Sequence, residues 1–316
     1  MRRLYINGSW IPSSSGDGID VVNPATEQVI DRVPVGTRAD AVAAVAAARD
    51  TFPRWAATAP ATRAKFLTAA GELLAARAER IARVIAADLG APYELALRLH
   101  VGLPLRVLRS YAKLAAEYPF DGGRAGDAVV VREPAGVAAA ITSWTLPLHL
   151  PVCKVAAALA AGCTVVLKPS EVAPLAAYEF AEVLHEAGLP PGVFNLVSGS
   201  GPVVGEALAG HPDVDVLSFT GTTAVGRRVG AIAADSVKRL ELELGGKAAS
   251  LILPDADLAA AVRATVESAF LNSGQTCAAW SRMLVHRDHY DEAVRLAVAA
   301  AREHRVGDPF AAGTRI

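Results

Sequence analysis

Residues 136–168, GVAAAITSWTLPLHLPVCKVAAALAAGCTVVLK, indicate the fold more clearly than any other stretch of the chain. The apolar run 137–142 predicts a strand, the segment 149–161 predicts a helix, and the β-branched run 164–167 predicts a second strand. A strand, a helix and a strand in this order are typical of a parallel strand pair joined by a helical crossover. The stretch therefore predicts an α/β fold.

The same alternation continues downstream to residue 244. Further strands are predicted at 193–197, 214–219 and 239–244, and helices at 175–187, 203–209 and 224–233. Five strands joined by four helical crossovers predict a parallel sheet with helices on both faces. Ligands of such sheets bind beyond the carboxyl ends of the strands. Those ends carry a polar, glycine-rich set that suits a phosphate-bearing ligand: Trp144, Lys168, the run 198–201, Thr220-Gly221 and the run 244–246.

The regions on either side of the sheet predict further elements. Before it, we expect short strands within 1–35 and helices at 39–52 and 62–89. Thr37 and Asp40 have the spacing of a capping box, and Gly90 ends the second helix. After the sheet, strands are predicted at 249–253 and 283–286, and helices at 256–272 and 288–304.

The composition narrows the class of protein. The 316 residues include 31 Lys+Arg and 32 Asp+Glu, and a net charge of -1 argues against a nucleic-acid or anionic-membrane partner. Pro147, Pro151 and Lys154 interrupt the long apolar stretch 134–167, so we expect no membrane span. Three cysteines are too few for a disulfide scaffold and lack the spacing of zinc ligands. We therefore expect a cytoplasmic protein without a metal site.

Two strand ends carry candidate groups for binding a nucleotide. In the turn 219–226, free N–H groups at a helix start can bind an anion. Glycine can also occur in such a turn for steric reasons alone, because a tight turn leaves no room for a side chain. Lys168 and Glu171 can bind ribose hydroxyls as donor and acceptor, or they can form a surface ion pair. The spacing alone leaves both alternatives open in each case.

Cys277 and Glu243 are candidates for covalent and acid–base chemistry. Cys277 lies between small residues that leave room for a substrate, which favours a nucleophile, although a lone cysteine is more often buried in a core. Cys153 and Cys163 have apolar surroundings and are expected in the core. Glu243 ends a strand that we expect to lie inside the sheet, where partial desolvation would raise its pKa and suit it to proton transfer. Glu241 lies on the same strand and face, and the pattern does not separate the two.

Taken together, these residues resemble the aldehyde dehydrogenase superfamily over the whole chain. The segments that carry the resemblance, in family order, are 6–10, 23–26, 132–137, 167–171, 219–226, 242–247, 272–282 and 306–309. The resemblance implies a Rossmann-like five-stranded parallel sheet with flanking helices, followed by part of a second α/β domain. It assigns residues 1–244 to an N-terminal segment plus the NAD-binding domain, and residues 245–316 to the first part of an incomplete catalytic domain.

The resemblance also implies an activity, the NAD-dependent oxidation of a small-molecule aldehyde to a carboxylic acid. Cys277 matches the nucleophile that forms a thiohemiacetal and then a thioester, Glu243 matches the general base, and Lys154 matches a lysine of proton relay and positioning. The positions that match cofactor-binding residues are Trp144, Lys168, Ser170, Glu171, Gly201, Phe219, Thr220, Gly221, Thr222, Gly226, Leu244 and Gly245. Glu171 would repel a 2′-phosphate, so NAD is expected rather than NADP.

Two departures from the family pattern give an alternative function. Thr145 stands where the family has an asparagine that donates to the oxyanion, and the loss of one such donor typically costs ~10²–10³ in rate. The family also continues beyond the point that corresponds to residue 316, with a nicotinamide-ribose contact and the C-terminal strand used to form homo-oligomers. A catalytically impaired NAD-binding fragment is therefore the alternative, and a thiol esterase that uses Cys277 without cofactor is a weaker one.

Overall fold

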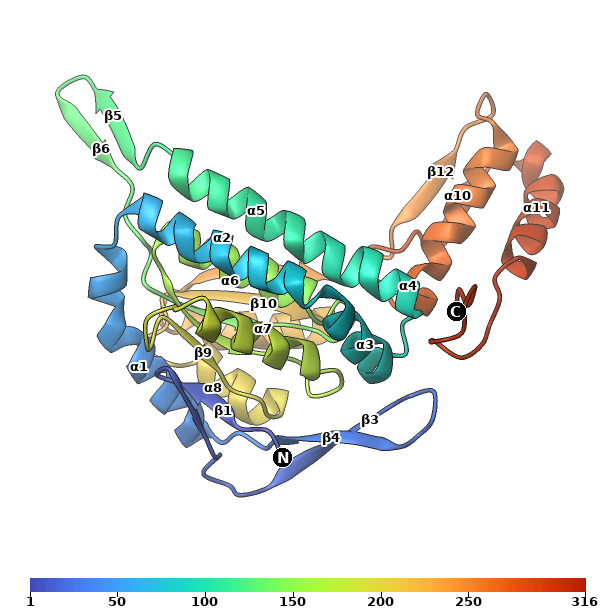
Figure 1. Ribbon diagram of the computed structural model, residues 1–316. Coiled ribbons are helices and arrows are strands. Elements are labelled where there is room, and N and C mark those ends of the chain that lie inside the picture. The colour runs from blue at the N-terminus through green and yellow to red at the C-terminus, as the bar shows by residue number, and fades with distance from the viewer.

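The computed structural model of the chain describes residues 1–316 with the exception of the Asp121 side chain. Its centre is a seven-stranded sheet with helices on both faces, and a smaller unit of two strands and two helices follows (Figure 1). The strands of the main sheet are, in spatial order, β11 (Arg239–Leu244), β10 (Val216–Gly221), β7 (Val137–Ile141), β8 (Thr164–Lys168), β9 (Phe194–Leu196), β1 (Leu4–Ile6) and β2 (Ser9–Ile11).

The five predicted strands β7 to β11 are present and parallel, which confirms the α/β fold class. Two short strands that were not predicted as part of this sheet extend it: β1 pairs antiparallel with β9, and β2 pairs antiparallel with β1. The helices that follow the parallel strands are α6 (His149–Ala161), α7 (Leu175–Glu186), α8 (Glu206–Ala209) and α9 (Thr223–Ala234). A π-helical turn, η2 (Gly201–Gly205), precedes α8, so the predicted helix 203–209 divides into two types of helix.

Strand β7 shows how the sheet separates two apolar cores. Ala138 and Ala140 belong to the core on one face, whereas Val137, Ala139 and Ile141 belong to the core on the other. This alternation follows from the two-residue period of a strand. The first core contains the buried sides of α6 and α7, and the second contains those of α8 and α9.

The helices before the sheet differ from the prediction in one place. Helix α1 (Arg38–Ala56) begins with the predicted capping box of Thr37 and Asp40. The predicted helix 62–89 is two helices, α2 (Pro60–Ala76) and α3 (Ala78–Leu89), because the backbone of Arg77 (φ -103°, ψ 10°) leaves the helical region. Gly90 ends α3 in the left-handed conformation (φ 76°), as predicted.

Residues 91–135, for which the sequence suggested no element, contain a long helix and a hairpin. They form α4 (Tyr93–Leu95), a π-helical turn η1 (Ala96–Val101), α5 (Gly102–Glu117), β5 (Asp121–Ala125) and β6 (Ala128–Val131). Helix α5 packs along α2 and α6. The β5–β6 hairpin projects from the end of α5 that lies far from α4 (Figure 1). A second hairpin, β3 (Gly18–Val22) with β4 (Val29–Pro34), lies near the N-terminus.

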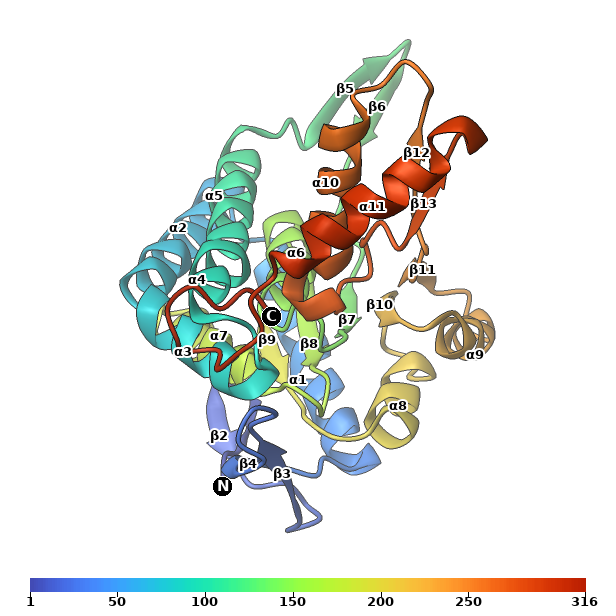
Figure 2. The same cartoon turned by 90° about the vertical axis from the view of Figure 1, so that its right-hand side faces the viewer.

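The smaller unit, residues 249–302, has the four elements that were predicted for it. They are β12 (Ala249–Ile252), α10 (Leu258–Phe270), β13 (Arg282–Val285) and α11 (Tyr290–Arg302), with short 3₁₀ turns η3 (Leu271–Gly274) and η4 (Arg287–His289). β12 and β13 are parallel, and α10 and α11 pack on them through a small core of their own. Figure 2 shows α10 and α11 above the end of the main sheet from which α6 begins.

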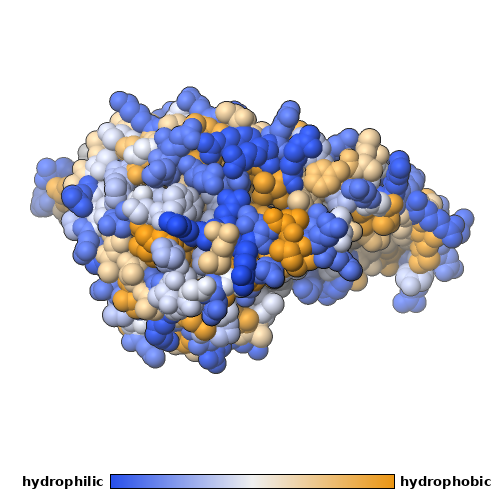
Figure 3. Space-filling model, turned by 60° about the horizontal axis from the view of Figure 1, so that its bottom comes forward, coloured by the Kyte–Doolittle hydropathy of each residue, from blue (hydrophilic) through white to orange (hydrophobic). Residues whose placement is uncertain are grey.

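Apolar side chains on the face drawn in Figure 3 lie in separate patches among hydrophilic ones. Every helix of the described residues is too short or too polar to cross a lipid bilayer.

Candidate active site at the carboxyl ends of the parallel strands

The strand order creates a topological switch point between β7 and β10. Helix α6, which follows β7, belongs to the core on one face, whereas α9, which follows β10, belongs to the core on the other. In open α/β sheets, ligands bind outside the carboxyl ends of the strands at such a point. Trp144 and Thr145 follow β7 here, and Thr220 and Gly221 end β10.

Lys168, at the end of β8, is buried and already paired. Only 2% of its surface is exposed, and its Nζ donates to Pro169 O (2.7 Å) and to Glu171 Oε2 (3.1 Å). Burial lowers the pKa of Lys168. Burial raises the pKa of Glu171, but the Lys168 ammonium and backbone hydrogen bonds, one of them from Gly201, bring it below its ordinary value. The ion pair that was one of the two alternatives for Lys168 and Glu171 is present, but Lys168 is not a surface residue.

The turn between β10 and α9 begins a well-capped helix. Thr222 caps α9, and its side chain accepts from the Val225 N–H (3.3 Å). A Cβ at Gly221 would collide with the Phe219 ring, and one at Gly226 would lie 2.7 Å from Leu244 Cδ2. The steric explanation for glycine therefore holds at both positions, and anion binding by this turn stays a prediction.

Strand β11 lies at the edge of the described sheet, so the prediction that Glu243 ends an inner strand was wrong. Among the described residues, β11 has β10 as its single neighbour, and both Glu241 and Glu243 are exposed. Position within a sheet depends on which strands pair, and the residues of β11 do not determine this. The expected desolvation of Glu243 is therefore absent from this structure.

Glu241 and Glu243, which the sequence pattern did not distinguish, have different hydrogen-bond partners in the structure. Glu243 Oε2 lies 3.4 Å from Thr220 Oγ1, beside the candidate cofactor turn. Glu241 Oε2 instead accepts from Ser218 Oγ (2.6 Å), which accepts from Lys154 Nζ (2.7 Å). Lys154 is thus linked to Glu241 and not to Glu243.

The three cysteines differ in exposure. Cys277 is exposed, which excludes the buried structural alternative, and Cys163 is buried as expected. Cys153, which was also expected in the core, is half-buried instead, with Sγ 3.5 Å from His149 Nε2, and burial raises its pKa to about 11. Within the described part of the chain, no three His, Cys, Asp or Glu side chains are grouped to hold a metal ion.

The turn before Cys277 is joined to the loop that carries Thr145. Asn272 Nδ2 donates to Thr145 O (2.9 Å) and to Gln275 O (3.0 Å). The Thr145 hydroxyl lies 3.1 Å from Ser143 Oγ. Two segments that are distant in the sequence are therefore held together at the ends of the sheet.

His100, Ser218 and the link made by Asn272 were not identified from the sequence. His100 lies in the π turn η1 and its Nε2 is 2.9 Å from Asn272 Oδ1. Asn272 was part of a segment that carried the resemblance, which was a usable signal. No pattern in residues 91–135 indicated His100.

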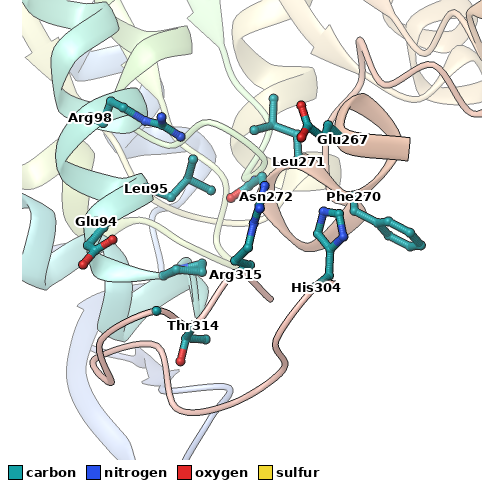
Figure 4. A pocket seen from close by; sticks show the side chains of 12 residues that line it. Glu94, Leu95, Arg98, Glu267, Phe270, Leu271, Asn272, His304, Thr314 and Arg315 are labelled. Carbon is teal, nitrogen blue, oxygen red and sulfur yellow. The ribbon is translucent and has the colours of Figure 1, made fainter. Parts of the chain in front are cut away.

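A cavity of about 510 Å³ lies beside this turn (Figure 4). Its walls come from α4 and η1 on one side, α10 and η3 on another, and residues 313–315. Arg98 and Glu267 lie on opposite sides of it, and Asn272 and Arg315 lie between them (Figure 4). Its described lining includes Asn272 but neither Cys277 nor Glu243, so it adjoins the candidate site without containing either of these two residues.

Comparison with protein families and curated proteins gives a consistent result. The sequence profile described as the aldehyde dehydrogenase family matches residues 10–316. A 3-succinoylsemialdehyde-pyridine dehydrogenase of Pseudomonas sp. is 45% identical over 316 residues, which are 100% of this chain and 66% of the relative. A chloroplastic betaine aldehyde dehydrogenase of Beta vulgaris is 38% identical over 330 residues, 100% of this chain and 65% of the relative. The chain thus spans about two thirds of the length of these relatives.

Solved structures agree in fold. A mutant of aldehyde dehydrogenase C from Pseudomonas syringae, in complex with NAD+ and octanal, matches with a TM-score of 0.97 and 46% identity, over 99% of this chain and 64% of that chain. An NADP-dependent enzyme of E. coli matches with a TM-score of 0.96 and 34% identity, over 100% of this chain and 66% of that chain.

Proposed function

The chain belongs to the aldehyde dehydrogenase family, and we propose that it serves the NAD-dependent oxidation of a small-molecule aldehyde to a carboxylic acid. The observation that carries the proposal is the exposed Cys277, on a turn that Asn272 fastens to the loop at the switch point of the sheet. Aldehydes are named in the relatives and in one similar structure that contains NAD+ and octanal.

The proposed chemistry forms and breaks one covalent bond at Cys277. The Cys277 thiolate attacks the aldehyde carbon, and the carbonyl electron pair moves to oxygen to give a thiohemiacetal. NAD, when bound, accepts the hydride that leaves this carbon, so that a thioester remains on Cys277. Glu243 takes a proton from water, and the hydroxide so formed attacks the thioester carbon, so that the C–S bond breaks and the carboxylic acid and the Cys277 thiolate are released. Lys154, linked to Glu241 through Ser218, serves proton relay and positioning.

For the cofactor, the buried Lys168 and the neighbouring Glu171 supply a donor and an acceptor that suit adenosine ribose. Other groups proposed to line this site are Trp144, Ser170, Gly201, Phe219, Thr220, Gly221, Thr222, Gly226, Leu244 and Gly245. The Glu171 carboxylate favours NAD because it would repel a 2′-phosphate. Similar structures include both NAD complexes and an NADP-dependent enzyme, so this preference is part of the proposal.

Three further features belong to the proposal. Residues 1–244 form the N-terminal segment plus the cofactor-binding domain, and residues 245–316 belong to the catalytic domain. The family forms homo-oligomers through a C-terminal strand that corresponds to positions beyond residue 316. The chain has three cysteines, too few for a disulfide scaffold, and this supports a location in the reducing cytoplasm.

A catalytically impaired NAD-binding protein is the second candidate, and one observation favours it. Thr145 replaces the asparagine of the oxyanion site, and its hydroxyl lies 3.1 Å from Ser143 Oγ, within hydrogen-bond distance. This candidate predicts NAD binding without turnover.

The test is NADH formation over an aldehyde panel that includes octanal and betaine aldehyde, together with NAD titration by calorimetry. We expect turnover in the natural chain, loss of turnover with retained NAD binding in Cys277→Ser, and no loss in the matched control Cys153→Ser. Turnover that survives Cys277→Ser would refute the proposed nucleophile. NAD binding without turnover in the natural chain would favour the second candidate.

A further inference from the structure

Three elements meet at a buried polar contact outside the residues given a chemical role above. His100, from the π turn η1, is 0% exposed, and Asn272, from the turn before Cys277, is 1% exposed. His100 Nε2 lies 2.9 Å from Asn272 Oδ1. Through its Nδ2, Asn272 reaches the backbone of Thr145 and Gln275.

The partners of Asn272 determine the tautomer of His100. The carbonyl oxygens of Thr145 and Gln275 can only accept, so the Asn272 NH₂ group must face them and its Oδ1 must face His100. Because Oδ1 can only accept, the proton of the imidazole must lie on Nε2. Nδ1 is buried without a hydrogen-bond partner among the described residues, so a second proton there would be unpaired.

The same burial keeps the ring neutral. It lowers the pKa of His100 to about 4, and the nearby His149 acts in the same direction, against the hydrogen bond that His100 donates to Asn272. His100 is therefore a neutral imidazole whose Nε2–H donates a hydrogen bond to Asn272.

The turn that contains Asn272 has an unfavourable backbone conformation. Asn272 (φ 55°, ψ 41°) and Ser273 (φ 57°, ψ 33°) are left-handed, and Gly274 (φ 75°) follows. Two consecutive non-glycine residues in this region persist only where surrounding contacts hold them. The side chain of Asn272 supplies two such contacts. It donates to the Gln275 carbonyl within its own turn and to the Thr145 carbonyl of the neighbouring loop.

We propose that His100 is a positioning residue for the Cys277 turn: its Nε2–H orients the Asn272 amide, which holds the left-handed turn and joins it to the Thr145 loop. The π turn explains how the ring reaches this place, since the i→i+5 geometry of η1 interrupts the helix between α4 and α5. The consequence for turnover rests on the function proposed above, whereas the consequence for the turn itself does not.

Two variants of the full chain test the proposal. Each replaces His100 by a residue with a side-chain amide, and the two amides differ in length. In His100→Gln the side-chain NH₂ can take the place of Nε2–H, whereas in His100→Asn it is too short, although both variants bury a similar polar group. Hydrogen exchange, read by mass spectrometry, compares peptides covering 271–277 and 142–148 with control peptides from β8 and α2. We expect at least tenfold faster exchange at 271–277 in the Asn variant, near-natural exchange in the Gln variant, and unchanged control peptides.

Steady-state kinetics supply the second readout. We expect kcat for aldehyde oxidation to fall at least tenfold in the Asn variant, with Kd for NAD unchanged and kcat restored by Gln. Equal exchange at 271–277 in both variants, or faster exchange spread over the whole chain, would overturn the proposal. If the natural chain lacks turnover, the function proposed above fails, and the exchange experiment still decides the role of His100.

Discussion

Strands β8 and β11 both end in a charged residue of the candidate site, but their surroundings are opposite. All five residues of β8 are buried, and Lys168 at its end is fixed by two hydrogen bonds. β11 lies at the described edge of the sheet, and Glu243 is exposed. Lys168, proposed to bind NAD, is thus held within the core, whereas Glu243, proposed for catalysis, has among the described residues a single side-chain hydrogen bond, to the neighbouring strand. We expect substitutions to affect the two halves separately.

The largest expected effect distinguishes Glu243 from Glu241 on β11. Glu243→Gln removes the proposed general base, and we expect steady-state NADH formation to fall by about 10³-fold. A burst of NADH equal to one turnover should remain, because only thioester hydrolysis needs this base. Stopped-flow absorbance measures both quantities. Glu241→Gln, the matched control, should keep steady-state turnover within about threefold, and an equal loss in both variants would contradict the assignment.

The second prediction concerns the stability of the buried region around β8 and α7. Asp88 of α3 is buried, its Oδ2 accepts from the Leu175 N–H that begins α7, and burial raises its pKa to about 7. The folded chain therefore binds this proton more tightly than the unfolded chain, so stability is lost as pH rises from about 4 to about 7. Asp88→Asn keeps an acceptor oxygen without the charge.

We expect Asp88→Asn to raise the free energy of unfolding by roughly 2–4 kcal/mol at pH 8 and to leave it nearly unchanged at pH 4. Urea denaturation at the two values of pH measures the difference. The exposed Asp50 provides the control variant Asp50→Asn. An Asp88→Asn curve parallel to that of the natural chain would show that Asp88 does not carry this proton.

A smaller effect tests whether Lys168 binds cofactor. Lys168→Met keeps most of the buried aliphatic stem but removes the ammonium, so we expect NAD affinity to fall about 30-fold, which corresponds to a charged hydrogen bond. Calorimetry measures the affinity, with the exposed Lys65→Met as control. Unchanged affinity would mean that the Lys168–Glu171 pair is purely structural.

The smallest expected effect is a gain. Thr145→Asn should restore part of the oxyanion interaction and raise kcat about tenfold, less than the full value of such a donor because the loop is adapted to threonine. Thr145→Ser keeps a hydroxyl and should give no gain. Steady-state rates at saturating NAD compare the three chains, and a lower rate in the Asn variant would show that Thr145 supports catalysis better.

The sequence predicted what local patterns determine. The strand–helix–strand unit 137–168 and the caps at Thr37 and Gly90 follow from periodicity and from the chemistry of single residues, and the structure confirms them. The break at Arg77 has neither glycine nor proline to indicate it. The family resemblance was confirmed by the profile over 10–316.

Properties that depend on pairing could not be predicted. The addition of β1 and β2 to the sheet depends on β9, a strand far away in the sequence, and β11 is at the edge because it has no second neighbour among the described residues. The link from His100 to Asn272 joins residues 172 positions apart and needs a left-handed turn that no residue pattern indicated. The roles assigned to Cys277 and Glu243 stay predictions until they are tested.

The graded exposure of the three cysteines makes the chain convenient for chemical labelling. Cys277 is exposed, Cys153 is half-buried and Cys163 is buried, so a bulky maleimide dye added in substoichiometric amount should react first at Cys277. A fluorophore placed there would report the approach of ligands without any engineered site. Because Cys277 is the most accessible of the three thiols, we expect peroxide to oxidise it first, so a reducing agent should protect the protein in storage.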